Sequence, residues 1–146
     1  MTQTATIHAS AVLIGPKAVL IRGPAGAGKS QLAFQLLQSA LAWTRLVADD
    51  RCLVEVHHGR LLVRPADELA GLIEIRGLGI RRLPYERIAA VGLVVDLDSA
   101  DAARLPARDA GQTSLEGVIL PRLAVGKGMA AMPLVTAFLR QLPAAD

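Results

Sequence analysis

Short apolar runs separated by glycine- and charge-rich breaks dominate the chain, and this pattern predicts a sheet rich in hairpins. Residues 7–14 are mainly apolar and end at Gly15-Pro16-Lys17, and residues 18–21 are a second apolar run. A turn signal between two such runs predicts that they pair as a hairpin. Over residues 31–41, leucine and alanine recur at helical spacing, which predicts a helix with one face on the sheet.

The middle of the chain continues in short strands. Residues 45–48 predict a strand that runs into Asp49-Asp50, and residues 52–56 and 60–64 predict a hairpin around His57-His58-Gly59. Residues 71–80 mix glycines and charges into an apolar run, which argues against a plain strand.

The last third contains the most hydrophobic strand, expected at residues 88–97. Residues 99–112 are polar and loop-like, and residues 118–125 favour a strand interrupted by Pro121. A terminal helix is expected over residues 129–142, broken or kinked at Pro133 because proline removes a helical hydrogen bond.

Length and pattern together predict one domain over residues 1–146 with an α/β fold. The sheet is expected to be mixed, because strict alternation of strands and helices is missing. Apolar residues make up 52% of the chain but aromatic residues only 3%, which excludes stacking on nucleic-acid bases. The net charge of +3 is mild, and no nucleic-acid partner is expected.

Cellular location is suggested by two features. Cys52 is the one cysteine, so it is expected to be a small buried residue in a reducing compartment. The N-terminus lacks a basic signal region, and no uncharged apolar run approaches the roughly 18 residues that span a bilayer. A soluble cytoplasmic protein without a membrane partner is predicted.

The clearest motif is Gly23-Pro24-Ala25-Gly26-Ala27-Gly28-Lys29-Ser30, which fits the phosphate-binding loop G-x-x-x-x-G-K-[ST]. Its glycines let backbone N–H groups converge on a polyphosphate, Lys29 reaches the outer phosphates, and Ser30 can ligate magnesium. A strand before the loop and a helix after it match the motif, because the helix N-terminus then points at the anion. Nucleotide hydrolases, kinases and nucleotide-dependent switch proteins all use this loop, so the motif alone does not tell which of these functions the chain has.

Carboxylates that follow apolar strands are the next candidates. Asp49 and Asp50 are expected at the ligand crevice, one to support magnesium and the other to accept a hydroxyl proton. A solvated turn or a helix cap is the alternative. Asp96, which ends the most hydrophobic run, is a rival for the metal.

Other polar residues carry weaker signals. Glu74 and Arg76 stand among glycines, where backbone can approach a ligand, although Arg76 also fits a solvated charge. His8 on an apolar segment is more typical of a core histidine than of a catalytic one. Adjacent His57 and His58 are assigned to a turn without a metal role.

Taken in order, these motifs resemble the catalytic domain of the HPr kinase/phosphorylase family over residues 8–125. The string Ile73-Glu74-Ile75-Arg76-Gly77-Leu78-Gly79-Ile80 is highly specific to that family. The resemblance implies a phosphate-loop fold similar to that of phosphoenolpyruvate carboxykinase. It also implies ATP- and magnesium-dependent phosphorylation of a serine on the phosphocarrier protein HPr, by a homohexamer.

Residue roles follow from the same resemblance. Nucleotide binding is assigned to the loop, from Gly23 to Ser30. Magnesium is assigned to Ser30, Asp49 and Glu74, and the base that deprotonates the serine to Asp50. The signature string adds Arg76, Gly77 and Gly79, and the remaining catalytic residues are His8, Lys29 and Arg104.

Departures from the family pattern change two expectations. The chain begins just before His8, so the regulatory N-terminal domain is expected to be absent, and Ala9 stands where glycine is usual. Gly126-Lys127-Gly128 replaces a longer segment that ends in Pro-Gly-Arg-Asn, so phosphorolysis of phosphoserine is expected to be weak or absent. Alternatives are a kinase for another substrate and a non-catalytic nucleotide-binding module.

Overall fold

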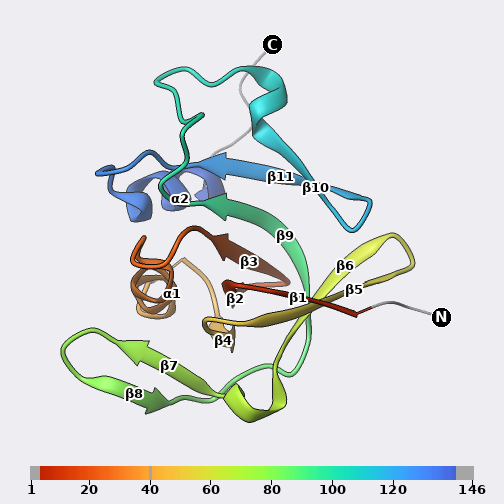
Figure 1. The fold of residues 1–146 in the computed structure, drawn as a ribbon, viewed down its shortest axis with the longest axis vertical. Helices are drawn as coiled ribbons and strands as arrows, with labels where there is room; N and C mark the ends of the chain where they lie inside the picture. Colours follow the sequence, from red (N-terminus) through yellow and green to blue (C-terminus); the bar gives the residue numbers. More distant parts are fainter. Residues whose placement is uncertain (1–3, 40, 141–146) are drawn as a thin grey trace.

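The computed structural model describes residues 4–39 and 41–140, which form a strongly curled sheet, two helices and a separate hairpin (Figure 1). The sheet has nine strands: β1 (Thr4–Ile7), β2 (Ala9–Ile14), β3 (Lys17–Arg22), β4 (Thr44–Ala48), β5 (Cys52–His57), β6 (Arg60–Pro65), β9 (Ala89–Asp96), β10 (Gln112–Leu115) and β11 (Val118–Ala124). The hairpin is β7 (Leu72–Ile75) with β8 (Gly79–Arg82), and the helices are α1 (Lys29–Leu37) and α2 (Ala131–Arg140). Two short 3-10 turns span Asp67–Leu69 and Arg108–Gly111.

Strand β9 organises the sheet because it pairs with three others. It runs parallel to β3 along most of its length and parallel to β11 at its end, while its first residues pair antiparallel with β6. The carboxyl ends of β3, β9 and β11 therefore lie at one edge, where ligands bind in open α/β sheets. The loop before α1 leaves from that edge (Figure 1).

Two apolar clusters cover the two faces of the sheet. On β3, Val19 and Ile21 pack in the cluster that contains α1, while Ala18 and Leu20 belong to the cluster on the opposite face. Successive side chains of a strand point to opposite faces, so an unbroken apolar run is what a strand buried on both sides requires. The predicted buried strand before the glycine loop is thus confirmed.

The predicted hairpins are confirmed. β2 pairs with β3 and β5 pairs with β6, both antiparallel. Strand β2 covers residues 9–14 of the segment expected at residues 7–14, and a bend at His8 separates it from Ile7, which ends β1. β1 pairs with β5 and β2 pairs with β3 and β4, so the two strands serve different halves of the curled sheet.

Both helices differ from their predicted bounds. α1 ends at Leu37, where Gln38 caps it, rather than continuing to residue 41. In α2 the predicted break at Pro133 is wrong, because Pro133 is the third residue of the helix and first-turn N–H groups have no partner within a helix. The last two residues of the predicted helix, 141 and 142, lie outside the described residues.

The end of the sheet also departs from the prediction. Pro121 does not interrupt β11, because it lies where the pairing of β11 passes from β10 to β9. Strand β10 was not predicted, since its residues are mostly polar or exposed. No helix within the described ranges is long and apolar enough to cross a membrane.

Candidate active site

The glycine loop joins β3 to α1 in a tight curl. Gly26 and Gly28 have φ of +82° and +99°, values that residues with a side chain rarely adopt. A Cβ at Gly23 would lie 3.1 Å from the Cβ of Leu97 and 3.2 Å from that of Ala27, so a side chain there would crowd both neighbours. Gly28 caps α1 directly, which aims the N–H groups of the first turn at the loop's centre.

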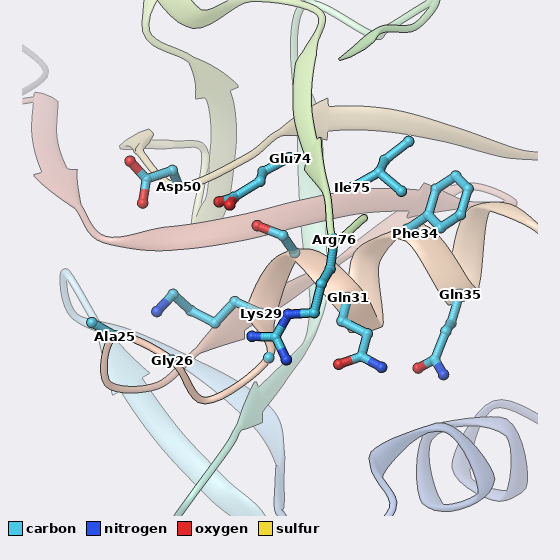
Figure 2. A pocket seen from close by; sticks show the side chains of 12 residues that line it. Ala25, Gly26, Lys29, Gln31, Phe34, Gln35, Asp50, Glu74, Ile75 and Arg76 are labelled. Atoms are coloured by element: carbon cyan, nitrogen blue, oxygen red, sulfur yellow. The ribbon is translucent and has the colours of Figure 1, made fainter. Parts of the chain in front are cut away.

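Lys29 lies folded over this loop. Its Nζ donates to the carbonyl oxygens of Gly23 at 2.8 Å and Pro24 at 3.1 Å, which holds the ammonium group above the curl. An ammonium group has three donors, so one remains for an anion. Figure 2 shows the side chain running beside the loop toward the pocket that Asp50 and Glu74 face.

A buried carboxylate, Asp49, connects the loop to the rest of the site. Its side chain accepts hydrogen bonds from Ser30 Oγ at 2.7 and 2.8 Å, from Ser10 Oγ at 2.6 Å and from the N–H of Glu74 at 3.1 Å. These donors come from α1, β2 and β7, elements far apart in the sequence. Asp49 therefore fixes where Ser30 and Glu74 lie relative to each other.

Asp50 occupies a strained position directly after this anchor. Its φ is +70°, and the N–H of Arg51 donates to the carbonyl oxygen of Asp49 at 2.8 Å, the pattern of a classic γ-turn. Strained turns of this kind persist where the surrounding contacts determine them, and they cluster at functional sites. The turn buries Asp49 while its neighbour Asp50 is exposed and lines the pocket.

The pocket in front of the loop has a volume of about 540 Å³. Charged side chains from four segments line it: Lys29 after the loop, Asp50 after β4, Glu74 on β7 and Arg76 just beyond it (Figure 2). Its far end is apolar, with Phe34 and Ile75. The arrangement can hold a polyphosphate on the loop with carboxylates opposite.

The oxygen-rich donor set fits magnesium. The Asp49 carboxylate accepts hydrogen bonds from the Ser30 hydroxyl and from the backbone N–H of Glu74, which brings these three residues together. Magnesium prefers one or two carboxylates plus water and phosphate oxygens. No group of three or more His, Cys, Asp or Glu side chains suited to a metal occurs in residues 4–39 and 41–140. A metal here would therefore depend on phosphate and water to complete its coordination.

Several expected site residues lie outside this pocket. His8 is exposed at the bend between β1 and β2, and Arg104 lies in an exposed loop. Neither is among the residues that line the pocket. Gly77 lies in the turn of the β7–β8 hairpin and Gly79 begins β8, each with a φ of +91°.

Asp96 is the alternative to Asp49 as the carboxylate that supports the metal, and two arginines donate hydrogen bonds to it. Arg22 donates to it at 2.7 and 2.8 Å, and Arg122 Nε donates at 2.5 Å. Burial tends to raise the pKa of this carboxyl, but the hydrogen bonds from Arg22 and Arg122 outweigh burial and lower it. The Ser30 hydroxyl contacts Asp49, so the geometry favours Asp49 as the metal-supporting carboxylate.

The cysteine and the paired histidines are not among the residues that line the pocket. Burial, with a smaller effect of the Asp49 charge, raises the pKa of the Cys52 thiol to about 12, so the thiol stays protonated at neutral pH. The expectation of a small buried residue is confirmed. His57 ends β5 and contacts Glu55 at 3.2 Å, while His58 begins the turn that follows.

Ser10 was not among the site residues predicted from the sequence. It is fully buried on β2, and its hydroxyl both donates to Asp49 and accepts from the N–H of Asp50 at 3.4 Å. A lone serine within an apolar strand was the available signal, because a buried hydroxyl requires a partner.

Comparison with known proteins points to one family. Residues 1–85 match the family described as HPr Serine kinase C-terminal domain. The HPr kinase/phosphorylase of Limosilactobacillus reuteri is 34% identical over 135 residues, which cover 82% of this chain and 40% of that protein. The Geobacillus thermodenitrificans protein of the same name is 32% identical over 155 residues, covering 94% of this chain and 48% of its own. The chain thus spans less than half the length of these curated relatives.

A solved structure confirms the fold. The Hpr(Ser) kinase/phosphatase from Coxiella burnetii matches with a TM-score of 0.75 and 22% identity, covering 93% of this chain and 94% of that one. The α/β fold with a mixed, hairpin-rich sheet, predicted from pattern and resemblance, is therefore confirmed.

Replacing Ser10 tests the Asp49 anchor. Ser10→Ala should lower the free energy of unfolding by about 1–3 kcal/mol, because the buried carboxylate loses one of its donors. Urea unfolding followed by circular dichroism measures this change. Ser114→Ala, at an exposed serine on β10, is the matched control and should stay within about 0.5 kcal/mol of the parent. Equal effects of the two substitutions would contradict the anchoring role.

Proposed function

The chain belongs to the HPr serine kinase family, and from that membership we propose that it transfers the γ-phosphoryl group of ATP to a serine of HPr. The observation that carries the proposal is the Asp49 carboxylate, which ties Ser30 of the phosphate loop to Glu74 of the family signature. Phosphoryl transfer to a hydroxyl uses a nucleotide-binding loop, a carboxylate that supports the metal and a free carboxylate that acts as the base.

The transfer would proceed by alignment and charge neutralisation. The loop from Gly23 to Ser30 and the Lys29 ammonium group hold the phosphates, and Ser30, Asp49 and Glu74 hold magnesium. When bound, magnesium neutralises the charge on the phosphate oxygens. Asp50 accepts the proton of the attacking serine hydroxyl, whose oxygen bonds to the γ-phosphorus as ADP leaves.

The position of Asp50 supports its role as the base. Its carboxylate is exposed in the pocket, whereas that of Asp49 is buried and already accepts several hydrogen bonds. A base must be within hydrogen-bond reach of the incoming hydroxyl, which an exposed side chain at the pocket mouth allows. Arg76, on the same pocket wall, is suited to a phosphate oxygen because its guanidinium group is planar and bidentate.

Two substitutions test the assignment with labelled ATP and purified HPr. Lys29→Ala should abolish transfer because the charge facing the phosphates is lost.

Asp50→Asn should retain ATP binding while slowing the formation of HPr phosphoserine by about two orders of magnitude, the usual scale for a lost general base.

The matched control for Asp50→Asn is Asp67→Asn, which neutralises an exposed carboxylate away from the pocket and should keep the parent rate. A full transfer rate in Lys29→Ala would overturn the phosphate-loop assignment. Parent protein that binds ATP but leaves HPr unmodified would indicate another substrate or a non-catalytic module.

The reverse reaction is expected to be weak or missing. Phosphorolysis needs a second phosphate held in line with the phosphoserine, and the short loop after β11 offers only exposed Lys127. A lysine lacks the planar fork with which arginine holds a phosphate at two points. Serine-phosphorylated HPr given excess phosphate should release pyrophosphate far more slowly than the forward reaction runs. Comparable rates in the two directions would show that the short loop suffices.

We propose a homohexamer acting in the cytoplasm, where ATP is available. Large apolar side chains on the surface support self-association: Leu78 is 58% exposed, Ile80 59% and Ile119 69%. The family resemblance supplies the subunit number. Light scattering at micromolar protein concentration should give six times the chain mass, and the mass of a monomer would contradict the proposal.

A further inference from the structure

A second hollow lies beside the glycine loop, between α1 and the segment that leads into α2. This α1–α2 cavity has a volume of about 340 Å³. Its walls come from α1, from the residues just after β9 and from the residues before and within α2; they include Gln31, Gln35, Leu97, Asp98, Met129 and Met132. None of the roles described above uses it.

The cavity joins the active-site pocket across the first turns of α1. Gly28, Gln31 and Gln35 line both hollows. The outer walls of the cavity follow β9 and β11, which run parallel to β3, so it lies at the same carboxyl edge as the phosphate loop. A group attached to phosphates on the loop can therefore reach it along that edge.

Hydrogen bonds between the strand ends hold these walls in place. The N–H of Leu97 donates to the carbonyl oxygen of Arg22 at 2.9 Å, and the N–H of Val125 donates to that of Asp96 at 2.8 Å. The ends of strands β3, β9 and β11 are thus joined by hydrogen bonds at the point where the cavity begins. Its wall on that side is preformed rather than assembled by a ligand.

The lining suits a flat aromatic ring with polar edges. Leu97 and Val125 are buried apolar residues, and methionine sulfur makes favourable contacts with aromatic rings. The amides of Gln31 and Gln35 each supply a donor and an acceptor, the pattern that the edge of a purine presents. We propose that the α1–α2 cavity binds the purine base of the nucleotide whose phosphates lie on the glycine loop. This rests on the nucleotide-binding part of the proposed function.

The apolar end of the active-site pocket, at Phe34 and Ile75, is the rival position for the base (Figure 2). That pocket also contains Asp50 and Glu74, and the acceptor hydroxyl must enter it to reach Asp50. A base on that side would compete with the acceptor for space. The α1–α2 cavity, on the other side of α1, leaves the acceptor's path open.

Filling the cavity tests the proposal by calorimetry on the full chain. Ala130 is exposed and lines the cavity, so Ala130→Trp fills its mouth without disturbing the core. Ala137 is exposed on α2 and does not line the cavity, so Ala137→Trp is the matched control. Each protein is titrated with ATP and with inorganic tripolyphosphate, which carries the phosphates without a base.

The parent and Ala137→Trp should bind ATP at least about tenfold more tightly than tripolyphosphate, since the buried base adds affinity. In Ala130→Trp, the Kd for ATP should rise to about that of tripolyphosphate, while the Kd for tripolyphosphate stays unchanged. Equal affinity of the parent for the two ligands, undiminished ATP binding by Ala130→Trp, or equal weakening of both ligands would each overturn the proposal.

Photolabelling of the unmodified chain gives an independent measurement. Irradiation with 8-azido-ATP should label residues 125–133, and excess ATP should prevent it. Labelling at Phe34 or Ile75 instead would place the base in the active-site pocket and overturn the proposal. Both measurements omit HPr. A chain that binds ATP through this cavity but never phosphorylates HPr would therefore disprove the proposed function and leave this inference standing.

Discussion

The structure around the site depends on one buried carboxylate. A charge removed from water is tolerated only where hydrogen bonds replace its hydration, and Asp49 obtains them from Ser10, Ser30 and the backbone of Glu74. Those donors belong to a sheet strand, the first turn of α1 and the separate hairpin. Satisfying this single group therefore holds together the phosphate loop and the signature hairpin.

The same carboxyl edge separates two chemical environments. On one side of α1, the pocket has charged walls made by Lys29, Asp50 and Glu74. On the other side, the cavity against α2 is lined largely by apolar residues and two methionines. A nucleotide has a charged end and an aromatic end, so a helix with a polar hollow on one flank and an apolar hollow on the other matches both.

A second polar network holds the long loop after β9. Arg122 donates to Asp96, to both carboxylate oxygens of Asp101, to Ser99 and to the carbonyl oxygen of Ala110. These hydrogen bonds lower the pKa of Asp101, so its contribution to stability is complete at neutral pH and is lost as the pH falls through that lowered pKa. The loop that carries Arg104 is thereby tied to the sheet at both ends.

Local features of the fold were predictable from the amino-acid sequence. The glycine loop, the hairpins and the buried strands follow from glycine positions and apolar periodicity, because backbone freedom and side-chain alternation act over a few residues. The break at His8, the role of Ser10 and the continuity of β11 through Pro121 were decided only by tertiary structure. Each depends on which distant strand or carboxylate lies alongside, and a local pattern of residues contains no information about a partner that is many residues away.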